Sequence, residues 1–160
     1  MVFIYRIVLD SKQDVYRDIA INSSGNLEDL HKAITSSFSI TDNQMASFYK
    51  SNKNWEQGEE YTLLETKESK YAFLMKGGIL RNITPKKNDR LIYVFDFFLM
   101  WTFFVELVDI QEIFEEHLPS VITKVGNMPE NSIDPNLKFS KYEKPQTDEF
   151  KNLSDEEYYL

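Results

Sequence analysis

The sequence contains no cysteine among its 160 residues and only two histidines. The missing thiol excludes disulfides, thiolate nucleophiles, and cysteine-ligated zinc or iron–sulfur sites. Without cysteine, two histidines cannot form a typical structural zinc site, and carboxylates would have to complete a catalytic one. We therefore predict no metal and no cofactor. A chain without cysteine also suits a cytoplasmic location.

Positive charge is scarce in this chain. Lys and Arg total 18 against 26 Asp and Glu, which gives a formal net charge of −8. An acidic chain is repelled by phosphate backbones unless a local basic patch overrides the mean field. The most basic cluster lies between Arg81 and Arg90, where Asn88 and Asp89 interrupt it, so we expect a solvated loop. Nucleic acid is therefore an alternative partner, not the preferred one.

The chain also lacks a long hydrophobic run. The longest segment without a charge is residues 97–105, whereas a membrane-spanning helix needs about 20 mostly apolar residues. Asp96 and Glu106 bracket this segment, and each would cost roughly 2.5–3.5 kcal/mol near a bilayer centre. The N-terminus has no basic n-region, and Arg6 interrupts its apolar run, so no signal peptide is expected. We predict no membrane association.

Residues 91–110 are instead rich in residues that favour β-strands. We expect strands over 91–97 and 101–110, joined at 98–100 by a buried turn or by a bulge in one bent strand. Segments apolar on both faces indicate central strands of a sheet. Asp96 and Glu106 share even parity and could lie on a partly solvated face. The odd-numbered side chains would then face the core: Tyr93, Phe95, Phe97, Trp101, Phe103, Val105 and Leu107.

The remaining pattern predicts further strands around one helix. Residues 2–9 and 15–21 are extended segments separated by a polar loop of hairpin length. Asn26 can cap a helix, and Leu27, Leu30, His31, Ile34 and Phe38 would form its apolar stripe. Shorter strands are expected at 44–49, 61–64 and 71–75. Strands grouped around one good helix indicate an α+β fold rather than alternating βαβ units.

The length of the chain fits one domain, which we place at residues 1–133. From residue 134 the composition becomes polar and acidic, so 134–160 is predicted to be an irregular C-terminal tail. Ser154 and Glu157 match a capping box within it, and they predict a last helical turn.

Four residues are candidates for a binding or catalytic site: His31, Asp96, Trp101 and Glu106. His31 could be a general base or a ligand, but a core histidine with a satisfied hydrogen bond explains its place on the apolar stripe more simply. Asp96 and Glu106 would be candidate acid–base groups if buried, although pairing with a nearby arginine is the simpler role. Trp101 could stack on a ligand, yet few basic residues surround it, as nucleic-acid stacking normally requires.

Several segments in order resemble the plasmid Ri ORF-3-like family, whose members are often described as insertion-element passenger, TnpR-type proteins. The segments are YRIVLD with VYRDIAI, LEDLHKAITSSF, MASFY, LIYVFDF and LP-x-V…G-x-x-P, within residues 3–130. The resemblance implies a roll-like mixed sheet packed on one main helix, with no established enzymatic activity.

This sequence departs from the family pattern in its most apolar segment. Asp96 and Trp101 match the pattern, but Phe98 and Leu99 stand where Gly-Asp is common, and Phe103 stands where His is common. If those polar positions carry a shared function, this chain has lost or changed it.

Three functions remain open at this stage. The preferred one is a non-enzymatic protein-interaction or binding module, which predicts an exposed apolar or aromatic patch and a protein partner. The alternative is a nucleic-acid-associated accessory protein linked to mobile elements, which needs a contiguous basic surface. The third is an enzyme that uses buried carboxylates with His31, which requires Asp96, Glu106 and His31 to meet in one pocket. The sequence does not indicate an oligomeric state.

Overall fold

One twisted sheet and one main helix make up the part of the protein that the computed structural model describes, residues 1–41, 44–67 and 70–129. Within these residues, eight strands lie in the order β5-β4-β3-β6-β7-β1-β2-β8. They are β1 (Val2–Leu9), β2 (Tyr16–Asn22), β3 (Ala46–Ser51), β4 (Glu60–Thr62), β5 (Phe73–Leu74), β6 (Arg90–Phe95), β7 (Trp101–Gln111) and β8 (Ser120–Val125). The β4–β5 pair is parallel and the other neighbouring pairs are antiparallel, so the sheet is mixed.

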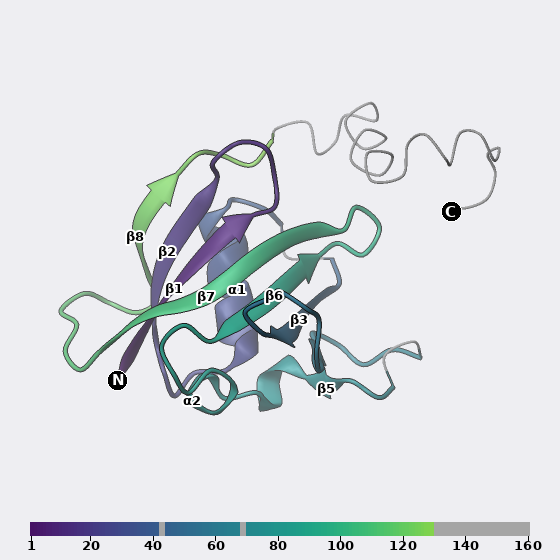
Figure 1. Cartoon of the computed structure of the whole chain (residues 1–160), viewed down its shortest axis with the longest axis horizontal. Coiled ribbons are helices and arrows are strands. Elements are labelled where there is room, and N and C mark those ends of the chain that lie inside the picture. Colours follow the sequence, from purple (N-terminus) through teal and green to yellow (C-terminus); the bar gives the residue numbers. More distant parts are fainter. Residues whose placement is uncertain (42–43, 68–69, 130–160) are drawn as a thin grey trace. The chain divides into compact units, whose positions relative to one another are not determined.

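The helix α1 (Leu27–Ser37) lies against one face of this sheet (Figure 1). It begins at Asn26, whose side chain accepts a hydrogen bond from the backbone N–H of Asp29, while the Asp29 carboxylate accepts from Asn26. This reciprocal capping box satisfies two N–H groups that a helix start leaves without partners. The stripe predicted from the sequence, Leu27, Leu30, His31, Ile34 and Phe38, is buried throughout. The predicted α+β fold, a mixed sheet packed on one main helix, is confirmed.

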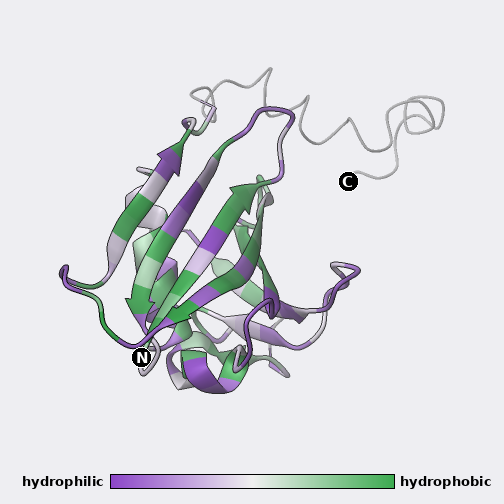
Figure 2. Ribbon diagram, turned by 60° about the vertical axis from the view of Figure 1, so that its left-hand side comes forward, coloured by the Kyte–Doolittle hydropathy of each residue, from purple (hydrophilic) through white to green (hydrophobic). Residues whose placement is uncertain are grey.

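The strand alternation divides the sheet into two faces (Figure 2). Trp101, Phe103, Val105 and Leu107 of β7 are buried, and Phe103 packs on Phe38 at the end of α1. This face therefore forms the main core. On the opposite face a smaller cluster of Val2, Ile4 and Ala20 packs against Val108, Phe114 and Leu118.

Residues 91–110 lie at the middle of the sheet as β6 and β7, which confirms the prediction of two central strands. Phe97 is a correction, because it was expected in the core and is instead 41% exposed. Phe97 belongs to the connection 96–100 and not to β6. The alternation of side chains between the two faces of a strand therefore does not apply to it.

Other elements differ from the sequence expectations. The short helices η1 (Met75–Gly77) and α2 (Leu80–Ile83), and strand β8, were not predicted. The predicted tail over 134–160, with the capping box at Ser154 and Glu157, lies outside the described residues, so it and the boundary at 133 stay predictions. None of the helices in the described part of the chain is long and apolar enough to span a membrane.

Candidate functional site: a pocket between α1 and β8

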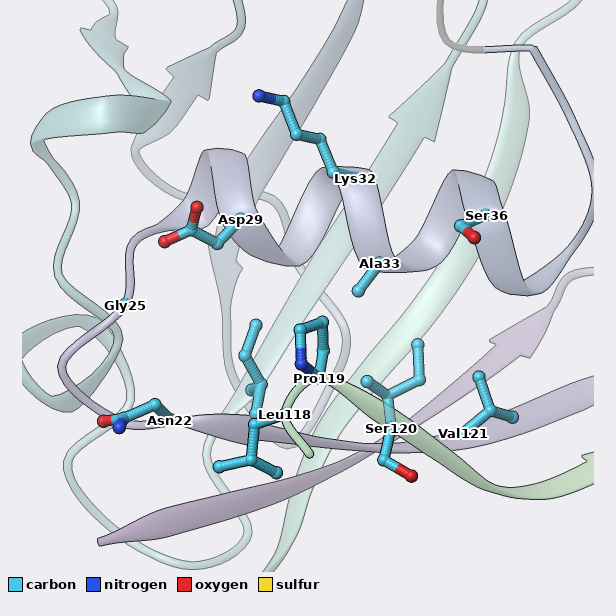
Figure 3. A pocket seen from close by; sticks show the side chains of 12 residues that line it. Asn22, Gly25, Asp29, Lys32, Ala33, Ser36, Leu118, Pro119, Ser120 and Val121 are labelled. Carbon is cyan, nitrogen blue, oxygen red and sulfur yellow. The ribbon is translucent and has the colours of Figure 1, made fainter. Parts of the chain in front are cut away.

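A pocket of about 470 Å³ lies between α1 and the beginning of β8, with β2 as its floor (Figure 3). We call it the α1–β8 pocket. Ile19 and Ile21 of β2 line the pocket, and Ala33 points from α1 toward Pro119. The full lining is Ile19, Ile21, Asn22, Gly25, Asp29, Lys32, Ala33, Ser36, Leu118, Pro119, Ser120 and Val121.

The turn from β2 into α1 holds one end of this pocket. A Cβ atom at Gly25 would lie 3.1 Å from both the Asn22 carbonyl oxygen and the Asp29 carboxylate. Gly25 therefore allows the chain to turn closely under the capping box and start α1 directly above β2. This tight turn sets the distance between the start of α1 and the end of β2, because a larger side chain at position 25 would contact Asn22 and Asp29.

Arg17 fixes the other end by joining α1, β2 and β8. Its side chain is buried, its Nε donates to the Ser37 carbonyl at 2.8 Å, and its Nη1 donates to the Val125 and Gly126 carbonyls at 3.0 Å each. Burial lowers the pKa of the guanidinium, but an arginine keeps its charge in proteins. Ser37 lies at the negative end of the α1 dipole, which stabilises a cation there.

The polar side chains around the pocket are mostly engaged by their own chain. The Asp29 carboxylate belongs to the capping box, the Asn22 side chain accepts from Ser24, and Ser120 donates to Glu116 at 3.0 Å. Lys32 points away from β2 and β8 in Figure 3, and its Nζ lies 3.7 Å from the Oε2 of Glu28. The surface left for a ligand is therefore mainly apolar.

His31 lies on the side of α1 that faces the sheet. It is 1% exposed, and its Nδ1 is 2.7 Å from the Tyr93 hydroxyl of β6. This geometry agrees with the simpler prediction of a core histidine with a satisfied hydrogen bond. Trp101 is likewise buried, at the beginning of β7 and directly opposite Phe95.

Asp96 shapes the connection between β6 and β7. It has φ 63°, and its Oδ1 accepts from the backbone N–H groups of Phe98 and Leu99 at 3.1 and 3.2 Å. An aspartate tolerates this left-handed conformation better than most residues and caps its own turn. The predicted pairing of Asp96 with an arginine does not appear among its hydrogen bonds and ion pairs in the described part of the chain.

Glu106 lies on the face of the sheet away from α1, in a row of alternating charges. It is directly opposite Arg90 of β6 and Arg6 of β1, with the Arg90 Nε 3.8 Å from its Oε1. Arg6 binds Asp18 of β2 through two hydrogen bonds of 2.8 and 2.9 Å, which raise the pKa of its guanidinium. Opposite charges facing each other across neighbouring strands stabilise the sheet, so the simpler reading of Glu106 as an ion-pair partner fits its position.

These four predicted residues do not form one site. His31 and Glu106 lie on opposite faces of the sheet, and Asp96 lies in a turn beyond β6. Across residues 1–41, 44–67 and 70–129 no cluster of three His, Asp or Glu side chains is placed to hold a metal ion. The residues of the α1–β8 pocket were missed as a site. The only sequence signal for its outer wall is SVITKV, six residues rich in β-branched side chains.

Comparisons with known proteins place this architecture among proteins of unknown function. A crystal structure of a protein of unknown function from Methanosarcina mazei Go1 has a TM-score of 0.61 and 18% identity, covering 77% of this chain and 68% of that one. At this identity the likeness shows the fold alone. No curated protein matches the sequence. The family model of the plasmid pRiA4b ORF-3-like protein matches residues 2–157.

Proposed function

The chain belongs to the plasmid pRiA4b ORF-3-like family, as its sequence motifs suggested, and from that premise we propose that it is a non-enzymatic protein-interaction module. Its binding site is the α1–β8 pocket, which accepts an apolar side chain from a segment of a partner protein.

The observation that carries this proposal is an apolar pocket beside an exposed apolar strand. Val121 lines the pocket and is 45% exposed, and Ile122 next to it is 42% exposed. An exposed apolar area continuous with a concavity is typical of a protein-binding surface. The pocket volume lies within the range of small-molecule sites. However, such sites use polar groups to orient a ligand, and here those groups are engaged within the chain.

The positions of the ionisable residues support binding over catalysis. A general acid and a general base must reach the same reacting atoms, and His31, Asp96 and Glu106 are separated by the sheet or by the length of a strand. His31 is buried against Tyr93, away from the pocket side of α1.

Selection of peptides from a displayed random library on the purified protein tests the proposal. We expect selected peptides to lose at least tenfold in affinity, about 1.4 kcal/mol, when the pocket is filled by Ala33→Arg or its wall is charged by Val121→Lys. Ala33 is 8% exposed and points into the pocket, so an arginine there occupies the space of the ligand.

The matched control is Phe98→Lys, which places the same charge on a second exposed apolar surface, the turn between β6 and β7, where Phe98 is 73% exposed. This variant should bind the peptides as the wild type does. Circular dichroism and thermal unfolding establish that each variant is folded. Peptides that bind the Ala33 and Val121 variants as tightly as the wild type, or that lose binding only in the Phe98 variant, would contradict the proposal.

A further inference from the structure

Strand β8 ends the sheet, and its second edge has no strand partner within the residues that the structure describes. Natural proteins protect such edges with proline, charged side chains, bulges or very short strands. β8 has six residues, Ser120–Val125, of which Lys124 alone is charged. By contrast, the strand at the opposite end, β5 (Phe73–Leu74), has two residues. β8 is the longer edge strand, and its protection is limited to Lys124 and to a bulge at Ile122, which the pairing of Val121 and Thr123 with β2 skips.

We infer that the partner segment is an extended, positively charged stretch of another protein that pairs with β8 as an additional strand beside the α1–β8 pocket. This inference rests on the proposed function and specifies its partner. In strand addition, main-chain hydrogen bonds supply affinity and pockets for individual side chains supply specificity. Val121 is part of β8 and also lines the α1–β8 pocket. A segment that forms main-chain hydrogen bonds with β8 can therefore place a side chain in the pocket.

Charge decides between the possible occupants of this edge. The chain carries a formal net charge of −8. Asp29 lines the pocket, and the Glu116 carboxylate lies 3.0 Å from the Ser120 hydroxyl at the beginning of β8. Glu112 and Glu115 add negative charge to the segment that leads into β8. Two cations oppose this negative charge: Lys32, which lies near Glu28, and Lys124, which lies at the far end of β8 from the pocket. A basic segment is therefore attracted to the end of the edge where β8 begins.

A second copy of the same chain fits the edge less well. Two copies would bring together two net charges of −8. A contact made by a six-residue strand alone is also small beside the roughly 1,200–2,000 Å² that stable interfaces bury. A flexible basic segment avoids both difficulties, because it can place its own apolar side chain in the pocket as it pairs.

Two random peptide libraries of equal length and hydrophobicity, one containing Lys and Arg and the other Asp and Glu, provide the test. We expect the basic library to yield binders that depend on Ala33 and the acidic library to yield at least tenfold fewer. N-methylation of alternate backbone nitrogens of a selected peptide should lower its affinity at least tenfold in one of the two registers, because a strand directs every second N–H toward its neighbour.

The outcomes separate this inference from the proposed function. Binders that depend on Ala33 but tolerate N-methylation in both registers, or come equally from both libraries, would overturn the strand-addition inference and leave the proposed function standing. If neither library yielded a binder whose affinity depends on Ala33, both the inference and the proposed function would be overturned. A protein that is dimeric without peptide, and that becomes monomeric on Val121→Glu, would show that a second copy occupies the edge and would also overturn the inference.

Discussion

Several buried polar side chains of this protein have specific hydrogen-bond partners. Arg17 binds backbone carbonyls of α1 and β8, His31 lies 2.7 Å from the Tyr93 hydroxyl, and Tyr5 lies 2.6 Å from the Thr84 hydroxyl. Burying a polar group without such a bond costs free energy. Arg17 and His31 therefore hold α1 on the sheet, and Tyr5 holds the segment after α2 on it.

Tyr5 predicts how the stability of the fold depends on alkaline pH. Burial raises its pKa above the ordinary value of 10.0, so the folded protein keeps the phenol proton at a pH where the unfolded chain has lost it. The stability is thus fully present below about pH 10 and falls as pH rises from there toward the folded pKa, by about 1.4 kcal/mol per pH unit for this group.

The measurement is the free energy of unfolding in urea as a function of pH. Tyr5→Phe should make the loss above pH 10 shallower, although burial also raises the pKa of Tyr49 and Tyr61, whose contributions remain. Tyr71→Phe is the control, because Tyr71 is fully at the surface, and it should leave the pH dependence unchanged. Equal slopes for the wild type and Tyr5→Phe would contradict this account.

At the scale of elements, the connection between β6 and β7 shows why an apolar segment can still turn. The sequence 98–100 contains no typical turn residue, so a buried turn or a bulge was expected. Asp96, which was counted as part of the strand, supplies the turn instead, and its backbone N–H donates to Met45 next to β3. The error arose from assigning Asp96 by strand parity, whereas its side chain bonds within the turn.

Substitutions at Asp96 should separate two roles of this residue: its tolerance of a positive φ and the hydrogen bonds that its side chain accepts. Asp96→Ala loses the acceptor for two N–H groups and is strained at φ 63°, so we expect a loss of about 2 kcal/mol in the free energy of unfolding. Asp96→Gly relieves the backbone strain but still loses the hydrogen-bond acceptor. It should lower the free energy of unfolding by about 1 kcal/mol. Asp96→Asn keeps both features and should be nearly neutral.

Urea denaturation of the three variants supplies these free energies. If Asp96→Asn cost as much as Asp96→Ala, the carboxylate charge itself would be responsible, and the capping account of this turn would be wrong.

Strand β8 shows a different limit of sequence interpretation. Its six residues have high β propensity, but Pro119 and Gly126, which flank them, are typical of turns and loops. Pairing with β2, which joins Ile19 to Val121 and Arg17 to Lys124, decides that the segment is a strand. Such a long-range contact is not encoded in the local pattern.

At the scale of the whole molecule, the sequence predicted the elements that carry strong periodicity. The hairpin of β1 and β2, the capped helix α1 and the central strands β6 and β7 follow from alternation and capping within short segments. The pocket could not be predicted in the same way. It is formed by α1 and β2, which are consecutive in the chain, and by β8, which begins only at Ser120. The completed sheet brings β8 to the other two elements.

Backbone amide hydrogen exchange with and without a selected peptide tests the central claim, that the α1–β8 pocket and the β8 edge together bind an extended partner segment. Amides that face outward from an unpaired edge exchange readily, and a paired strand protects them. We predict that peptide binding slows exchange in β8, at residues 120–125, and around Ala33, while the Phe98 turn stays unchanged. Protection confined to the Phe98 turn, or none in β8, would contradict the account.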